Sequence, residues 1–168
     1  MKSLLLFAAV SIGTLTACGQ RVNTQSPIAE VKGTTASGTT IYVRYNQPSL
    51  RGRVIGKTID PYPGKVWRTG ADSATVFEVN KAVKVEGKSL AAGRYALFTM
   101  ADGDNWTIII NTGVHKWGLS YNQSDDVFRV NVKADKNKTP QEQFTITVSK
   151  KGKVDLLWGD YDVPFKVE

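Results

Sequence analysis

The chain has 168 residues, a formal net charge of +7 at pH 7 and a single cysteine, which excludes an intrachain disulfide. Roughly 150 residues follow the apolar N-terminal stretch, and a chain of that length buries roughly 68–70% of its unfolded surface, so we expect one self-sufficient core. The basic charge suits anionic lipid headgroups, lipopolysaccharide or peptidoglycan. The lysines, however, are spread along the chain, which is typical of solvated strand edges and turns.

The N-terminus has the pattern of a secretory signal peptide. Lys2 precedes an almost wholly apolar or small stretch, Leu4–Thr16, which is shorter than the roughly 20 residues that a bilayer-spanning helix needs. The stretch ends in Leu15-Thr16-Ala17-Cys18-Gly19, which resembles the lipobox of bacterial lipoproteins. The resemblance implies a signal peptide over residues 1–17 and lipidation of Cys18. An ordinary secretory signal with an incidental cysteine is the alternative.

Two or more acyl chains hold a protein firmly to a membrane. We therefore expect an exported protein that is lipid-anchored in the cell envelope, faces the periplasm, sits on the outer membrane and has no nucleic-acid partner. Residues 18–38 are rich in Gly, Ser, Thr, Asn and Gln and show no apolar period, so they are predicted to be the lipidated cysteine and a flexible tether. An edge strand beginning at Val31-Lys32 would shorten that tether.

From Thr39 onward, apolar and polar residues alternate in short runs, a pattern typical of strands with one buried face. Gly103 and Gly152 lie where hairpin turns need a positive φ. The runs Leu97–Met100 and Ile108–Ile110 are apolar on both faces and are predicted to be central strands. The predicted strands are Ile41–Asn46, Val76–Val79, Val83–Val85, Arg94–Met100, Trp106–Ile110, Phe128–Lys133, Phe144–Ser149, Val154–Trp158 and Val163–Val167.

Many short strands at about 8–12-residue spacing predict an all-β fold, a single antiparallel β-sandwich or jelly-roll-like domain over residues 39–168. One stretch, between Tyr45 and Thr75, has no clean strand and contains three prolines and four glycines. Its Tyr62 and Trp67 argue against disorder, so we expect a long ordered loop packed on one end or face of the sandwich. Such loops are usually functional.

Several runs of the chain match one known family. They are Pro48–Arg53, Pro61-Tyr62, Gly64–Ala71, Leu90–Thr99 and Trp117-Gly118, and they resemble the bacterial domain-of-unknown-function family 2911. The resemblance covers Ile41 to about Val132 and, more loosely, the remainder. The chain departs from the family pattern at Pro63, an extra residue, and at Ala92, where a proline is common. The resemblance implies an exported protein or lipoprotein with one domain, and it supplies no activity, substrate or catalytic residue.

The long loop is the predicted ligand site. Arg68 could clamp a carboxylate or phosphate through its planar fork, or it could pair internally with Asp72 or Asp60. Trp67 and Trp117 could stack on a sugar or pack in the core, whereas Trp106, within a strand, is predicted to be core. We expect a binding module for a small anionic or carbohydrate ligand at the 60–72 loop. The predicted ligand-binding residues are Tyr62, Lys65, Trp67, Arg68, Asp72, His115 and Trp117.

The sequence contains no recognisable catalytic motif. The chain contains no Gly-x-Ser-x-Gly elbow, no Ser-x-x-Lys set and no Gly-rich phosphate loop, so the catalytic residues stay unknown and no cofactor is predicted. With one histidine, His115, and a lipidated cysteine, a zinc site lacks ligands, and no metal is predicted. Calcium-binding loops at Asp102–Asn105 or Asp160–Asp162 stay open beside ordinary turns.

Two other functions also stay open. One is a structural or interaction protein of the cell envelope, whose loop docks onto another envelope component. The other is a hydrolase that uses His115 or an acidic pair drawn from Asp60, Asp72 and Glu78.

Overall fold

The computed structural model describes residues 26–114 and 120–168. Within these two ranges the chain is built from β-strands, with one turn of 3-10 helix and no α-helix. No helix in this part of the chain is long and apolar enough to cross a membrane. The elements are β1 (Ile28–Thr34), β2 (Thr40–Asn46), β3 (Val66–Trp67), β4 (Thr75–Val79), β5 (Val83–Val85), β6 (Lys88–Leu90), β7 (Gly93–Asp102), β8 (Asn105–Asn111), η1 (Gln123–Asp125), β9 (Asp126–Lys133), β10 (Asp135–Val148) and β11 (Lys153–Lys166).

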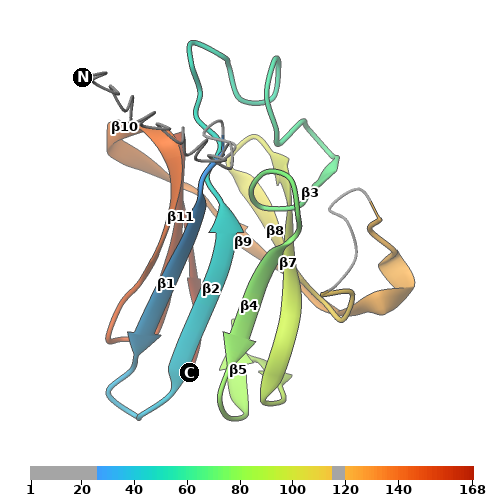
Figure 1. The fold of residues 1–168 in the computed structure, drawn as a ribbon, viewed down its shortest axis with the longest axis vertical. Helices are drawn as coiled ribbons and strands as arrows, with labels where there is room; N and C mark the ends of the chain where they lie inside the picture. Colours follow the sequence, from blue (N-terminus) through green and yellow to red (C-terminus); the bar gives the residue numbers. More distant parts are fainter. Residues whose placement is uncertain (1–25, 115–119) are drawn as a thin grey trace, which may run out of the picture.

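Two antiparallel layers form a β-sandwich, as predicted (Figure 1). The main sheet has the strand order β1-β2-β4-β7-β8-β9, and the short β3 pairs with the end of β7. The second layer is the long β10–β11 ribbon, which contacts the main sheet at both of its edge strands, β1 and β9. A small β5–β6 hairpin closes one end, and β5 contacts β11.

The core lies between the two layers and is made by the alternation that the sequence predicts. Ile41, Val43 and Tyr45 on β2 are each at most 4% exposed, because their side chains point toward the ribbon. The ribbon contributes Phe144 and Trp158, both fully buried. The Tyr45 hydroxyl accepts a hydrogen bond from the Ile146 N–H at 2.8 Å, which joins the layers directly. The predicted core position of Trp106 is also confirmed.

The outer face of the main sheet carries a second, smaller apolar cluster. Ala96, Phe98 and Ile109 are buried there, and the ring of Tyr121 packs edge-on against Phe98. Because β7 and β8 thus bury side chains on both faces, the predicted central strands are confirmed.

The predicted tether over residues 18–38 is wrong for its second half. β1 pairs with β2 along its whole length, from Ile28 opposite Asn46 to Thr34 opposite Thr40, so the domain begins well before Thr39. The inward positions of β1 are Ala29, Val31 and Gly33, and because two of these residues are small, the alternation of apolar and polar residues along the strand is weak. At Gly33 the smallness is required, because an added Cβ would lie 2.5 Å from a methyl carbon of Val148.

The ribbon also differs from the sequence prediction, which placed two separate strands at its C-terminal end. β11 is continuous through Gly159, which has a φ of +55°. A Cβ on Gly159 would lie 2.8 Å from the Ile55 side chain, so glycine here lets the long loop approach the ribbon closely. The strand bends enough that the Lys153 Nζ lies 2.6 Å from an Asp155 carboxylate oxygen and 3.9 Å from one of Asp162.

Candidate functional site

The long loop between β2 and β4 is ordered and built onto the ribbon, as the sequence predicts. The Leu50 N–H donates to the Glu142 carbonyl, and the Phe144 N–H donates to the Pro48 carbonyl, both at 2.9 Å. Deeper in the loop, the indole N–H of Trp158 donates to the Asp60 carbonyl at 2.9 Å. These bonds position the loop from the backbone of β10 and from the core.

The turn that follows β3 is held by side chains bonded to its own carbonyls. The Trp67 indole N–H donates to the Gly70 carbonyl at 2.9 Å, and the Thr75 hydroxyl donates to the Thr69 carbonyl at 2.6 Å. The Arg68 Nη1 donates to the Asp72 carbonyl at 2.7 Å. The turn lies against the end of β2, because a Cβ on Gly70 would meet the Asn46 carbonyl oxygen at 2.9 Å.

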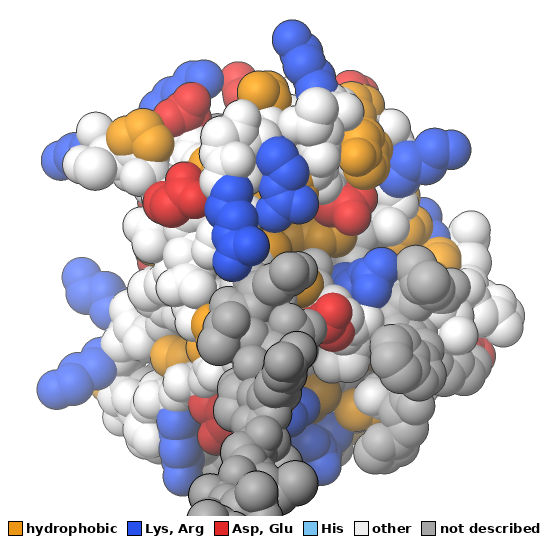
Figure 2. All heavy atoms as spheres, turned by 45° about the horizontal axis from the view of Figure 1, so that its top comes forward, with side chains coloured by type: hydrophobic (Ala, Val, Ile, Leu, Met, Phe, Trp, Pro, Cys, Tyr) orange, Lys and Arg blue, Asp and Glu red, His pale blue; other side chains and the backbone are white. Residues whose placement is uncertain are grey.

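Between the loop and this turn lies a cavity of about 310 Å³. Its walls include the buried Trp67 and Ile59 and the backbone of Gly70. In Figure 2 this end of the molecule comes forward, and Lys and Arg side chains gather there beside acidic ones. We name the cavity the arginine cleft, after its charged lining: Arg51, Arg53, Asp60, Arg68 and Asp72.

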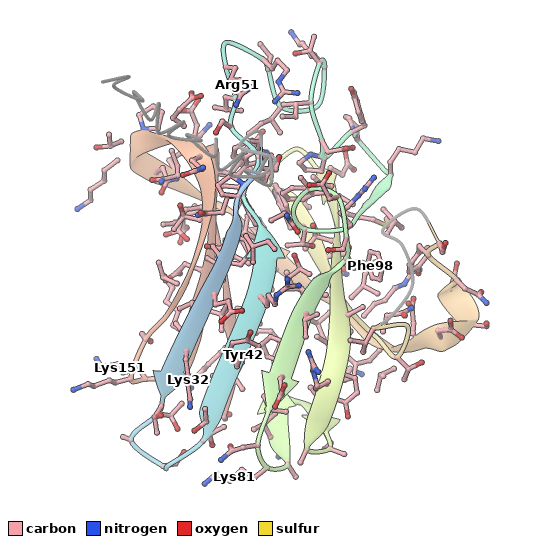
Figure 3. All side chains as sticks on the ribbon, viewed as in Figure 1. Lys32, Tyr42, Arg51, Lys81, Phe98 and Lys151 are labelled. Atoms are coloured by element: carbon pink, nitrogen blue, oxygen red, sulfur yellow. The ribbon has the colours of Figure 1, made fainter. Side chains whose placement is uncertain are left out.

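Most guanidinium N–H groups of the arginine cleft have no acceptor among residues 26–114 and 120–168. Arg53 donates to the carbonyls of Leu50 and Ser49, at 3.0 Å and 2.6 Å, and Arg68 donates once, to Asp72. The Arg51 side chain, labelled in Figure 3, has no hydrogen bond or ion pair with any residue that the structure describes. Since each guanidinium carries five N–H donors, the cleft retains donors for a bound carboxylate or phosphate.

Asp60 is the half-buried carboxyl of the cleft. Burial raises the pKa of Asp60 above its ordinary value, while the positive charge of Arg68 and the backbone N–H of Tyr62 oppose that rise. The lining of the cleft thus combines three arginines with the two carboxyl groups of Asp60 and Asp72. The arrangement can hold an anionic group on the arginines and a hydrogen-bond donor on Asp60.

The structure brings three of the predicted site residues together, Trp67, Arg68 and Asp72. Tyr62 and Lys65 are exposed on the loop and do not line the cleft. His115 and Trp117 lie outside the described residues.

Trp67 has a different role from the one expected of a sugar platform. It is only 3% exposed, and its ring packs against Phe144 and Trp158 with centroid distances of 5.0 Å and 6.5 Å. Protein atoms therefore cover the ring, which is the core-packing alternative of the two that the sequence left open. Its contribution to the cleft is structural, because it holds the Gly70 carbonyl in place.

Arg51 and Arg53 line the cleft but are not among the ligand-binding residues predicted from the sequence. Both stand in the Pro48–Arg53 run, which contributed only to the family resemblance. Two arginines around a glycine, in a loop long enough to fold back on Arg68, were the available signal.

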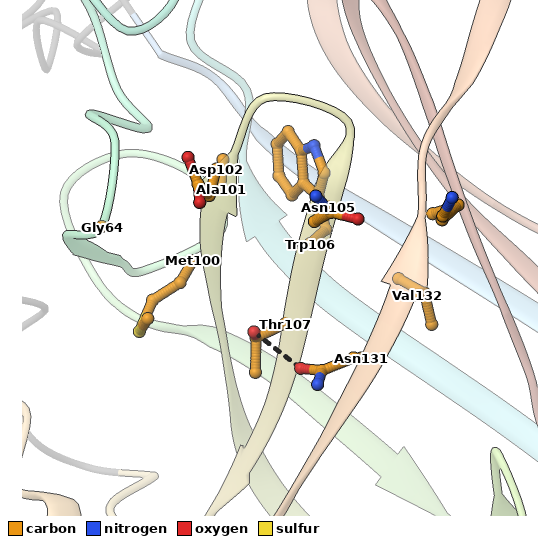
Figure 4. Close-up of a pocket in the computed structure, with 10 residues that line it drawn as sticks. Gly64, Met100, Ala101, Asp102, Asn105, Trp106, Thr107, Asn131 and Val132 are labelled. Atoms are coloured by element: carbon orange, nitrogen blue, oxygen red, sulfur yellow. Dashed lines mark hydrogen bonds between the residues drawn. The ribbon is translucent and has the colours of Figure 1, made fainter.

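A larger hollow of about 540 Å³ lies beside the β7–β8 hairpin and β9 (Figure 4). Two of its polar side chains satisfy each other, since the Thr107 hydroxyl donates to the Asn131 amide oxygen at 3.0 Å. Its charged lining is limited to Asp102 and Lys133, so the arginine cleft is the stronger candidate site. Within residues 26–114 and 120–168, no group of three or more His, Cys, Asp or Glu side chains could hold a metal ion.

The comparisons with known proteins give one match. The model of a family described as a protein of unknown function, DUF2911, matches residues 26–167. No curated protein and no solved structure matches the chain. The matched range starts just before β1 and includes β10 and β11, so it covers both layers of the sandwich and the arginine cleft. The chain therefore belongs to the DUF2911 family, and the resemblance found in the sequence is confirmed.

Proposed function

We propose that this protein is an envelope lipoprotein, anchored to the outer membrane through Cys18, whose domain binds a small anionic ligand in the arginine cleft. One observation carries the binding proposal: Arg51, Arg53 and Arg68 line a single cavity, and most of their N–H donors have no acceptor in the part of the chain that the structure describes. A planar guanidinium binds carboxylate and phosphate through two parallel hydrogen bonds, which makes arginine the residue suited to such ligands.

The anchor is supported by the N-terminal sequence. A short basic start, an apolar stretch and Leu15-Thr16-Ala17-Cys18 form the pattern of a processed lipoprotein signal. Cleavage before Cys18 would leave the domain on the periplasmic side of the membrane, tethered by its acylated N-terminus.

The cleft also limits what kind of anion fits. Its volume of about 310 Å³ lies at the lower end of the roughly 300–1,000 Å³ usual for small-molecule sites. Asp60 and Asp72 beside the arginines favour a ligand that carries hydroxyl or amino donors as well as its acidic group. A bare sugar fits less well, because the Trp67 ring is packed against protein.

The test is ligand-induced thermal stabilisation of the full lipidated protein in detergent. The probes are inorganic phosphate, glycerol phosphate, a hydroxycarboxylate and an amino acid. A ligand at a hundred times its Kd stabilises a protein by about 2.7 kcal/mol. The test variant is Arg51→Ala, because the Arg51 side chain bonds to no described residue, so we expect its loss to leave the fold intact. Arg94→Ala is the matched control, since Arg94 is exposed on β7 and paired with Glu78.

We expect at least one probe to stabilise the wild type and the Arg94→Ala variant, and the Arg51→Ala variant to bind it at least tenfold more weakly. Recovery of the ligand unchanged separates binding from the hydrolase alternative. The binding proposal fails if none of the probes raises the melting temperature, or if both arginine variants lose the effect equally.

A further inference from the structure

Exposed apolar side chains gather at one end of the sandwich. Four large hydrophobic residues stand out as exposed within the described part of the chain: Ile28 at 56%, Val54 at 53%, Val127 at 43% and Tyr62 at 39%. Val54 and Tyr62 lie on the long loop, and Ile28 is the first residue of β1, next to the start of that loop. Val127 lies near the start of β9, away from the β7–β8 hairpin that the loop contacts.

The same loop is cationic. Residues 47–65 contain Arg51, Arg53, Lys57 and Lys65, all exposed, against the single acidic residue Asp60. Figure 2 shows Lys and Arg side chains, with some acidic ones beside them, around apolar atoms on this face. Exposed apolar groups flanked by cations are the combination that suits an anionic lipid surface, because the apolar groups enter the headgroup boundary while the cations meet phosphates. We name the surface made by Ile28, Arg51–Val54, Lys57, Tyr62 and Lys65 the loop face.

The described chain begins at this end. The Asn46 side-chain amide donates to the Ser26 carbonyl at 3.0 Å, and the Gln47 N–H donates to the Pro27 carbonyl at 2.8 Å. Ser26 stands eight positions after Cys18. Even fully extended, eight residues span at most about 28 Å. A lipid on Cys18 would therefore keep the loop face, rather than the β5–β6 end, close to the bilayer.

We propose that the loop face rests on the anionic headgroup surface of the membrane that holds the anchor. Val54 and Tyr62 then lie in the headgroup region, and Lys57 and Lys65, which are exposed and lie outside the arginine cleft, pair with lipid phosphates. This inference rests on the lipid anchor of the proposed function. Ser26 and Arg51 belong to this end and also line the arginine cleft, so the cleft lies beside the membrane-facing surface.

The experiment places a polarity-sensitive thiol dye on the full lipidated chain in vesicles. Cys18 is the only cysteine and is blocked by its lipid, so Val54→Cys and Tyr62→Cys each give one reactive thiol. Val127→Cys is the matched control, because Val127 is similarly exposed and lies outside the loop face. Emission is compared in vesicles of phosphatidylcholine alone and of phosphatidylcholine with phosphatidylglycerol.

We expect the dye at positions 54 and 62 to shift to shorter wavelength in the phosphatidylglycerol vesicles, and the dye at position 127 not to shift. An equal wavelength shift at positions 54 and 127 in the phosphatidylglycerol vesicles overturns the inference. So does a shift of the same size in neutral vesicles, because charge complementarity is part of the proposal. Dye uptake by wild-type Cys18 would instead show that the anchor is missing, which removes the proposed lipoprotein and this inference with it.

Discussion

The indole N–H of Trp158 donates a hydrogen bond of 2.9 Å to the backbone carbonyl of Asp60. Trp158 is fully buried on β11, and Asp60 supplies a carboxyl group to the arginine cleft. The ring of Trp158 also stacks on that of Trp67, whose own N–H holds the Gly70 carbonyl. Two core tryptophans thus each hold a backbone carbonyl of a residue that lines the cleft.

Replacement of Trp158 tests this support. Trp158→Phe leaves the Asp60 carbonyl without its donor, and a buried unsatisfied group costs about 1–3 kcal/mol in addition to the lost packing. We expect the urea midpoint to fall accordingly. Trp106→Phe is the matched control, because Trp106 is equally buried but its indole nitrogen has no partner among the described residues. A larger loss from Trp106→Phe than from Trp158→Phe would contradict the role of the bond.

Two glycines with nearly the same backbone conformation allow the cost of backbone strain to be measured apart from the cost of a steric clash. Gly87 and Gly152 have φ values of +79° and +78°, but an added Cβ meets nothing within 4 Å at Gly87 and lies 2.0 Å from the Val167 carbonyl oxygen at Gly152. Gly87→Ala should cost about 1–2 kcal/mol, the usual penalty for a left-handed residue. Gly152→Ala should cost more than about 3 kcal/mol, because it also breaks the bond from the Val167 N–H to the Gly152 carbonyl.

The measurement is the free energy of unfolding from urea titration of both variants. If both variants lose the same free energy of unfolding, the C-terminal residues can move away from Gly152 without cost. The contact between Val167 and Gly152 would then contribute little to stability.

The predictable part of the fold is the part with one strongly apolar face. Ile41, Val43 and Tyr45 alternate with polar residues because one face of β2 is covered by the ribbon, so the period alone identifies the strand. β1 has the same one-sided geometry, but Gly33 stands where a larger side chain would collide with Val148. The period is therefore weak, and the tertiary contact that explains it is invisible in the sequence.

The long loop that lines the candidate site was predictable from the sequence, but the side chains that converge in the arginine cleft were only partly so. Prolines, glycines and aromatic residues identify the long loop, since no strand period competes with them. Which of its side chains converge depends on how the loop folds onto β10, and no local pattern encodes that contact. Arg51 was missed for this reason. Trp67, the last residue of β3, packs its ring into the core, whereas Arg68, which follows the strand, contributes its charge to the lining of the cleft.

The boundary of the domain gives a further prediction. A chain that begins at Thr39 lacks β1 and exposes the edge of β2 along its whole length. Unpaired strand edges promote association between molecules. We expect such a chain to aggregate or to melt well below a matched chain that begins at Ser26, as measured by size-exclusion chromatography and thermal unfolding. Equal behaviour of the two chains would make β1 dispensable.

Stability should also depend on pH through Asp162. Burial, and then the nearby charge of Asp155, raise the pKa of Asp162 above its ordinary value of 3.8, and Lys153 opposes the rise. Below about pH 3.8 the carboxyl is protonated in both the folded and unfolded states, so it changes nothing. As the pH rises through the folded pKa, the unfolded chain loses the proton more readily, and the folded state becomes relatively less stable.

Asp162→Asn removes that titration. We expect urea midpoints for the variant and the wild type to agree near pH 3.5, and the variant to be the more stable at pH 7. The Lys153–Asp155 ion pair, at 2.6 Å, remains in the variant, so the charge of Lys153 stays compensated. Asp160→Asn, an exposed change on the same strand, is the control for the loss of one carboxylate. A variant that is less stable than the wild type at pH 7 would show that the attraction between Asp162 and Lys153 outweighs burial and the repulsion from Asp155.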